Sequence, residues 1–133
     1  MFKICIVLAG LFGAIGVAMG AYTAHGLGFI DSLQAREAAR VSMQSAVHYQ
    51  LLHAVVLLAI GLWLRQSADN RALLVAAVLF VLGIVLFSGL IYLQTLTSVQ
   101  ALRSFVPWGG TCFILAWLAL AAAALMERVP PAA

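Results

Sequence analysis

Four long apolar runs separated by shorter polar segments set the pattern of this chain. The runs extend over Ile4 to Tyr22, Ala46 to Leu64, Ala72 to Leu93 and Val106 to Met126, and none contains a charged residue. A helix needs about 20 apolar residues to cross a bilayer, and helices satisfy their own backbone hydrogen bonds in lipid. The pattern predicts an all-α fold, a four-transmembrane-helix bundle that forms one integral membrane domain over residues 1–133.

The one long polar segment lies between the first two runs. Gly26 is expected to end the first helix, and Asp31 with Gln34 three residues later resembles a capping box that starts a second. An amphipathic helical segment then continues into the second run. From Ser32 to Leu64 it would measure about 50 Å, against a hydrocarbon core of about 30 Å, so its first turns are expected beyond the hydrocarbon. Its charged side chains are expected to form a solvated face: Arg36, Glu37 and Arg40.

Composition agrees with a membrane protein, because 65% of the residues are hydrophobic and only 8% are charged, against about 25% in ordinary soluble domains. The first run, preceded by Lys3 and containing "AMGA", could alternatively be a cleavable secretory signal. Its length and its stripe of small residues favour a retained helix. This stripe, at helical spacing, suits close helix packing and consists of Ala9, Gly13, Gly16 and Gly20.

The distribution of charge bears on orientation and partners. Basic residues flank every run, with Lys3, Arg65, Arg71 and Arg128 on one side of the membrane and Arg36, Arg40 and Arg103 on the other. The side that carries four basic residues rather than three is the one that holds both termini, so the positive-inside rule favours cytoplasmic termini. No basic patch indicates nucleic-acid binding. The expected partners are the lipid bilayer and either other membrane proteins or further copies of the chain.

Polar and aromatic side chains concentrate at one predicted membrane face. In the predicted topology this face collects Tyr22, His25, His48, Tyr49, Gln50, Tyr92, Gln94 and Trp108. An aromatic belt would explain its tyrosines and tryptophan, but not its histidines and glutamine. We therefore expect a polar or ligand-binding cluster that also includes two deeper residues, His53 and Ser88.

His53 is the most informative of these residues, because it would lie about 10 Å below the start of the hydrocarbon. Ionisable side chains at such depth usually face the bundle interior and find a partner. At about 100° per residue, Tyr49 and Gln50 lie within about 60° of His53, whereas His48 is about 140° away. Tyr49, Gln50 and His53 are therefore expected to share a face.

Enzymatic chemistry has little support in the sequence. No carboxylate lies inside a predicted span, and the His-Glu-x-x-His pattern of zinc proteases is absent. Cys5 and Cys112 are expected near opposite membrane faces, so neither a disulfide nor a cysteine metal cluster is expected. No metal or cofactor is therefore assigned, although His25 and His53 remain loose candidates for haem ligands.

The chain resembles the YgdD-like family of small bacterial inner-membrane proteins, which has a related small eukaryotic transmembrane family. The matching stretches are "AHGL" at 24–27, "YQLLHA" at 49–54, "LFSG" at 86–89 and "VPWGG" at 106–110. The resemblance implies a four-pass helical fold in the bacterial inner membrane, with no established activity. It points to Gly89, Gly109 and Gly110 as further packing positions. Trp108 and the "AYTAHG" segment depart from the family pattern, so Tyr22 and Trp108 are weaker candidates for a shared site.

Three functions remain open at this point. The leading hypothesis is a non-enzymatic accessory or scaffold subunit whose polar cluster, near the non-cytoplasmic face, fixes the helix packing. The alternative is a binder or transporter of a small molecule or ion, with a pocket around His25, Tyr49 and His53. The second alternative is a redox subunit that carries a cofactor on His25 or His53.

Overall fold

Four long helices make up most of the structure, a computed structural model that describes residues 1–67 and 69–127. The third helix runs from Arg71 to Thr97 and changes character along its length. In chain order the elements are α1 (Phe2–His25), the short 3-10 helix η1 (Leu27–Phe29), α2 (Leu33–Trp63), α3 (Arg71–Gly83), the π-helical η2 (Ile84–Gly89), α4 (Leu90–Thr97), the 3-10 helix η3 (Gln100–Phe105) and α5 (Val106–Met126). The structure confirms the all-α prediction, with four helices long and apolar enough to cross a membrane.

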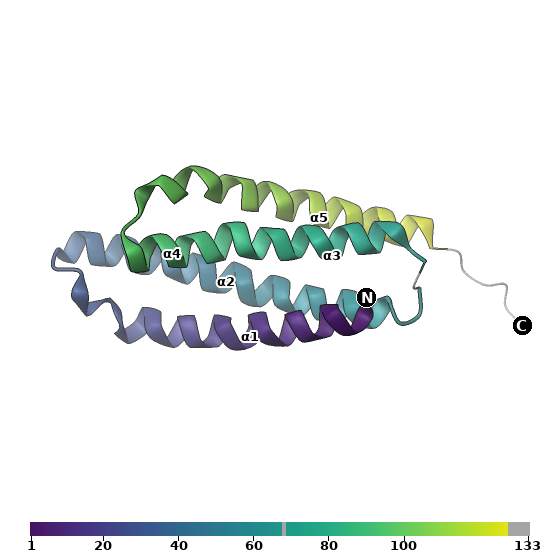
Figure 1. The fold of residues 1–133 in the computed structure, drawn as a ribbon, viewed down its shortest axis with the longest axis horizontal. Helices are drawn as coiled ribbons and strands as arrows, with labels where there is room; N and C mark the ends of the chain where they lie inside the picture. Colours follow the sequence, from purple (N-terminus) through teal and green to yellow (C-terminus); the bar gives the residue numbers. More distant parts are fainter. Residues whose placement is uncertain (68, 128–133) are drawn as a thin grey trace, which may run out of the picture.

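The helices lie side by side in the order α1, α2, α3 and α5 (Figure 1). α1 packs mainly on α2, α5 packs on α3 and η2, and α2 meets the third helix through α3, η2 and α4. As a result α1 and α5 occupy opposite edges. In the most apolar stretch of α1 only 17% of the residues are buried inside the molecule. In the corresponding stretch of α2 the buried share is 39%. α2 and α5 both rest on the third helix rather than packing closely on each other.

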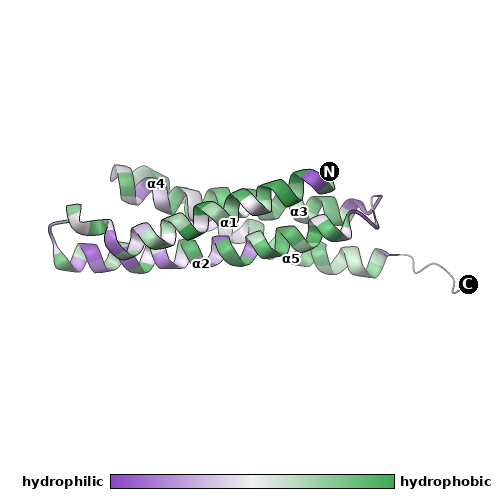
Figure 2. Ribbon diagram, turned by 90° about the horizontal axis from the view of Figure 1, so that it is seen from below, coloured by the Kyte–Doolittle hydropathy of each residue, from purple (hydrophilic) through white to green (hydrophobic). Residues whose placement is uncertain are grey.

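The distribution of polar residues agrees with a membrane-spanning orientation. Apolar residues cover the middle of the helices, while hydrophilic residues gather at the projecting start of α2 and at the α2–α3 connection (Figure 2). The start of α1 and the end of α5 lie at the same end of the molecule (Figure 1). This arrangement is expected of four crossings, which bring the start of α1 and the end of α5 to one side.

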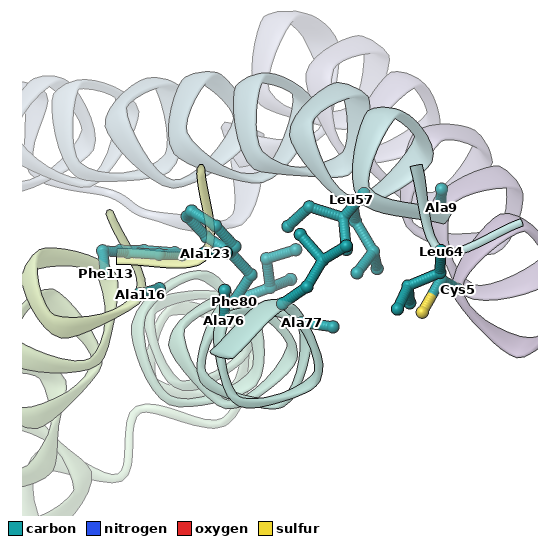
Figure 3. Packing of buried hydrophobic residues seen from close by; sticks show 13 residues of the cluster. Cys5, Ala9, Leu57, Leu64, Ala76, Ala77, Phe80, Phe113, Ala116 and Ala123 are labelled. Carbon is teal, nitrogen blue, oxygen red and sulfur yellow. The ribbon is translucent and has the colours of Figure 1, made fainter. Parts of the chain in front are cut away.

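The main core lies along the contact of α3 with α2 and α5 (Figure 3). Phe80 and Leu57 are fully buried there, and the alanines of α3 and α5 let the helix backbones approach closely. Small residues serve this purpose in membranes, where dispersion and close packing replace the hydrophobic effect between helices. Cys5 lies in the same core, whereas Cys112 is half-buried on α5, and both are free thiols.

The start of α2 corrects two sequence predictions. Ser32, not Asp31, is the N-cap, because its extended backbone lets its hydroxyl accept a hydrogen bond from the Ala35 amide at 3.3 Å. Arg36, expected on a solvated face, is half-buried. Its Nε and Nη2 donate to the Ile30 carbonyl at 2.9 and 2.7 Å, so the guanidinium fixes the turn that leads into α2. The expectation of an exposed side chain holds for Glu37, but Arg40 is half-buried.

Candidate functional site

His53 lies at the centre of the polar residues of α2 and is only 2% exposed. Its Nδ1 lies 2.7 Å from the Tyr49 carbonyl, and its Nε2 lies 3.3 Å from Trp117 Nε1 on α5. A carbonyl can only accept and an indole N–H can only donate. These partners therefore specify a neutral imidazole with its proton on Nδ1, and they leave no free lone pair on His53 for a metal or haem iron.

Aromatic rings surround the imidazole and hold it in the interior. The His53 ring stacks on Phe113 with 3.8 Å between centroids and 10° between planes. Phe80 approaches it at 5.4 Å, and Trp117 meets it edge-on at 6.2 Å. Tyr49 stacks over the remaining side at 5.8 Å. His53 thus joins α2 to both α3 and α5, and the prediction that it faces inward is confirmed.

Gln50 departs from the expected arrangement. Its side chain is 2% exposed and its Nε2 donates to the Phe12 carbonyl of α1 at 2.7 Å. Tyr49, by contrast, lies against Phe87 and Phe113 and is 41% exposed. The expected common face of Tyr49, Gln50 and His53 is therefore divided between two interfaces. The physical reason is that α2 lies between α1 and the third helix. Two side chains that point about 60° apart around the axis of α2 can therefore contact different neighbouring helices.

Ser88 links the third helix to α2. It is fully buried, and its hydroxyl donates to the Ala46 carbonyl at 2.7 Å. Ser88 lies in the π-helical η2, a type of turn that is rare and usually occurs as a short insertion within an α-helix. A Cβ added to Gly89 beside it would come no closer than 3.9 Å to any neighbour. The close approach expected at this point is therefore made by Ser88, not by Gly89.

The predicted packing positions differ sharply in how closely they are approached. A Cβ on Gly16 would lie 2.7 Å from Leu51, and one on Gly109 would lie 2.4 Å from the Phe87 backbone nitrogen. Gly20 has an ordinary contact with Val47, and Ala9 is buried. Gly13 and Gly110 have nothing within 4 Å of an added Cβ. Three close approaches outside the predicted positions occur at Gly26, against the Tyr22 ring, at Gly61, against Cys5 and Ile6, and at Gly83, against Phe113.

Tyr92 packs on Met43 and Ala46 in a small second core. It is 7% exposed, and its hydroxyl has no hydrogen-bond partner among the residues that the structure describes. A buried hydroxyl without a partner costs free energy relative to an apolar group of the same shape. Tyr92 therefore contributes its ring to packing, while its hydroxyl forms no part of a polar cluster.

We expect Tyr92→Phe to keep or raise the melting temperature in detergent, because it removes only the unpartnered hydroxyl. Tyr92→Ala should lower it, since loss of a buried aromatic ring costs about 3–5 kcal/mol. Thermal unfolding of the two variants beside wild type measures both effects. Destabilisation by the phenylalanine variant would show that the hydroxyl has a partner after all.

The remaining candidates lie at the surface. His25, at the end of α1, and His48, on α2, are both exposed. His48 forms the rim of a groove between α2 and α5, the α2–α5 groove, of about 620 Å³. Tyr49, His53, Gly110, Phe113 and Trp117 also line it, but His25 and Tyr92 do not. The cavity expected around His25, Tyr49 and His53 thus exists without His25 and opens sideways between two helices.

Within residues 1–67 and 69–127, no three His, Cys, Asp or Glu side chains are grouped to hold a metal.

A second polar cluster, at the opposite end of the bundle, was not predicted. Trp63 Nε1 donates to both carboxylate oxygens of Glu127 at 2.9 and 2.8 Å, and the Ser67 hydroxyl donates to the same carboxylate. Asn70 caps α3 at Leu73 and donates to the Ala123 carbonyl at 2.9 Å. These residues resemble an ordinary membrane boundary in the sequence, because only the tertiary structure brings the end of α5 beside the α2–α3 connection.

The hydrogen bonds from Ser67 and Trp63 lower the pKa of Glu127 below its ordinary value of 4.5. A carboxyl group with a lowered folded-state pKa stabilises the fold above its unfolded pKa, and this contribution is lost as pH falls through the folded pKa. We therefore expect the melting temperature in detergent to fall on acidification below about pH 4.5. Glu127→Gln should weaken that dependence, and Glu37→Gln, at an exposed site, should not. If wild type and both variants lost stability equally on acidification, Glu127 would not be the source of the pH dependence.

Comparison with known proteins gives the chain its family. The family described as "Protein of unknown function (DUF423)" matches residues 19–110. A "UPF0382 membrane protein" of Staphylococcus epidermidis is 37% identical over 123 residues, 92% of this chain and 96% of the relative. A protein of the same name from Haemophilus influenzae is 32% identical over 87% of this chain and 89% of its own length. The "UPF0382 inner membrane protein YgdD" of Escherichia coli is 28% identical over 95% of this chain and 93% of its own length.

No solved structure matches the chain with significance. The similarity to the staphylococcal relative nevertheless extends over almost the full length of both proteins, in agreement with the four apolar helices. The chain therefore belongs to the DUF423 family of UPF0382 membrane proteins, whose function is unknown.

Proposed function

We propose that this protein is a non-enzymatic accessory or scaffold subunit of the bacterial inner membrane. The observation that carries the proposal is the use of its buried polar side chains to join helices. Gln50 joins α2 to α1, Ser88 joins η2 to α2, and His53 joins α2 to α5. Each of the three side chains already has a hydrogen-bond partner on a neighbouring helix, which supports a structural role rather than action on a substrate.

The edge position of α1 supports a role beside other membrane proteins. Its outward face carries small residues at helical spacing, namely Gly10, Ala14 and Ala18, all of them exposed. A Cβ added to Gly10 would meet nothing within 4 Å. A neighbouring transmembrane helix could therefore approach α1 closely without any change in the fold. Such a neighbour would belong to another membrane protein or to a further copy of this chain.

Site-specific photocrosslinking tests this role. A photoreactive residue at Ala14 should give a discrete protein adduct in native membranes, and Gly10→Leu should abolish that adduct by filling the docking face. The same crosslinker at Val78, an exposed residue of α3, is the control. Adducts with lipid alone at both positions, or an adduct that persists in Gly10→Leu, would contradict the proposal.

We also propose that both chain ends face the cytoplasm. The side that holds both ends carries four basic residues and the other side carries three, and the side with more Lys and Arg tends to be cytoplasmic. A green fluorescent protein fused to the C-terminus is expected to fluoresce, and an alkaline phosphatase fused there should be inactive. The reverse pair of results would place the ends in the periplasm.

A further inference from the structure

Two cavities on the same side of the molecule meet at Phe87. The first is the α2–α5 groove described above. The second, of about 660 Å³, lies between the projecting start of α2 and the segment from α4 to η3, and we call it the interfacial groove. Phe87 lines both, and their linings continue from Val106 in one to Pro107 in the other. The two grooves therefore adjoin one another beside the third helix, and we call the pair the trough.

The trough exists because α2 and α5 both rest on the third helix without closing over it. Gly109 presses against the backbone of Leu86 and Phe87 and fixes α5 there. Gly110, one residue later, lines the trough and offers no side chain to fill it. The opening faces sideways, toward the space that lipid occupies in a membrane.

Polarity changes along the trough from one end to the other. The interfacial end has the exposed guanidinium of Arg103 and the hydroxyls of Ser42 and Ser45. The deep end is mostly apolar, with Ile114, Phe113 and Trp117, although Tyr49 and His53 also line it. Among the residues that the structure describes, no Asp or Glu lines either groove. A cationic, hydroxyl-rich end at the membrane surface followed by an apolar channel is complementary to an amphiphile with an anionic head.

The length of the trough supports the same occupant. From Val106 to Trp117 along α5 is about 16 Å at 1.5 Å per residue, close to half of a hydrocarbon core of about 30 Å. The apolar part therefore runs through about one leaflet, which is the depth reached by an acyl chain whose head lies at the surface.

We propose that the trough binds one anionic phospholipid, with its phosphate at Arg103 and an acyl chain along Phe87 toward Phe113 and Trp117. The charge of the head selects the lipid, since a cationic side chain at the surface favours anionic lipid by a factor of about five. The apolar walls accept the chain. This binding does not depend on the scaffold role, because the trough lies between α2 and α5 and the proposed docking face lies on α1.

The test uses the fluorescence of Trp117, which lines the trough. The double variant Trp63→Phe/Trp108→Phe leaves Trp117 as the single tryptophan, and its melting temperature is measured first. The protein is reconstituted in vesicles of phosphatidylcholine with rising fractions of phosphatidylglycerol whose acyl chains carry bromine, which quenches tryptophan at contact. Brominated phosphatidylcholine serves as the neutral comparison.

Quenching by phosphatidylglycerol should reach half of its limit at about a fivefold lower fraction than quenching by phosphatidylcholine. Arg103→Gln should remove this preference and Arg103→Lys should keep it. Gly110→Phe should fill the trough and weaken quenching by both lipids, and Gly110→Ala is its control.

Equal quenching by the two lipids, or an unchanged preference in Arg103→Gln, would overturn the proposal and leave Trp117 with ordinary surrounding lipid. Native mass spectrometry of the detergent-purified protein gives a second readout that does not depend on the tryptophan variants. One retained phospholipid in wild type, lost in Arg103→Gln, supports the proposal. Retention of a neutral amphiphile instead would contradict it.

Discussion

Gly109→Ala is expected to destabilise the protein strongly. The added Cβ would lie 2.4 Å from the Phe87 nitrogen and 2.8 Å from the Leu86 carbonyl carbon. Both of these are backbone atoms, so no rotation of a side chain can relieve the overlap, and α5 must move away from η2. Overpacking typically costs about 1–3 kcal/mol, and the backbone contact places this case at or above the upper value. A fall in melting temperature of about 10 °C follows for a chain of this size.

Gly110→Ala provides the matched control, because the same change one residue later meets nothing within 4 Å. The two glycines share the "VPWGG" stretch and the same helical propensity, so any difference between their alanine variants reports tertiary contact. Thermal unfolding in detergent, followed by circular dichroism, compares both with wild type. Similar melting temperatures for the two variants would show that α5 does not lie against η2 as described.

His53→Ala carries the second large expected effect. It removes the ring that stacks on Phe113 at 3.8 Å and leaves the Trp117 N–H without its acceptor at 3.3 Å. An interhelical hydrogen bond in a membrane contributes about 0.6–1.7 kcal/mol, and the cavity left by a large buried side chain adds to that loss. We expect a total loss of about 2–4 kcal/mol, measured as a lower melting temperature and a changed Trp117 fluorescence spectrum.

His48→Ala is the control for His53→Ala, since His48 is an exposed histidine of the same helix. Its melting temperature should equal that of wild type. His53→Phe separates the two contributions, because a phenylalanine ring can keep the stacking on Phe113 but cannot accept the hydrogen bond. An unchanged melting temperature in His53→Ala would contradict a structural role for the imidazole.

The inward orientation of His53 was predictable because it depends on position along a single helix, and the side chain is 2% exposed. A neutral imidazole about 10 Å inside the hydrocarbon needs a partner, and the structure supplies Trp117. The identity of the partner was not predictable, since 64 residues separate the two in the chain. The same limit applies to Trp63 and Glu127, which also lie 64 residues apart.

The glycines show how much of the packing was open to prediction. The stripe on α1 correctly indicated a helix contact at Gly16, but Gly13 on the same stripe has free space beside it. A stripe of small residues indicates approximately which face of a helix packs against a neighbour. A close approach at one residue also requires that the neighbouring helix pass beside that particular residue. Gly61 and Gly83, which have tight neighbours, carry no comparable signal because each stands alone in an apolar run.

The sequence by itself determined that the chain crosses a membrane four times as helices, and it determined which polar residues lie at each end and which lie deep. These properties follow from the length and polarity of each run, because lipid accepts no unsatisfied backbone. Only the tertiary structure decided the order of the helices, the turn of Gln50 toward α1 and of His53 toward α5, and the open trough between α2 and α5. In lipid both the inner and the outer faces of a helix are apolar, so hydrophobic periodicity carries little information about which face meets a neighbour.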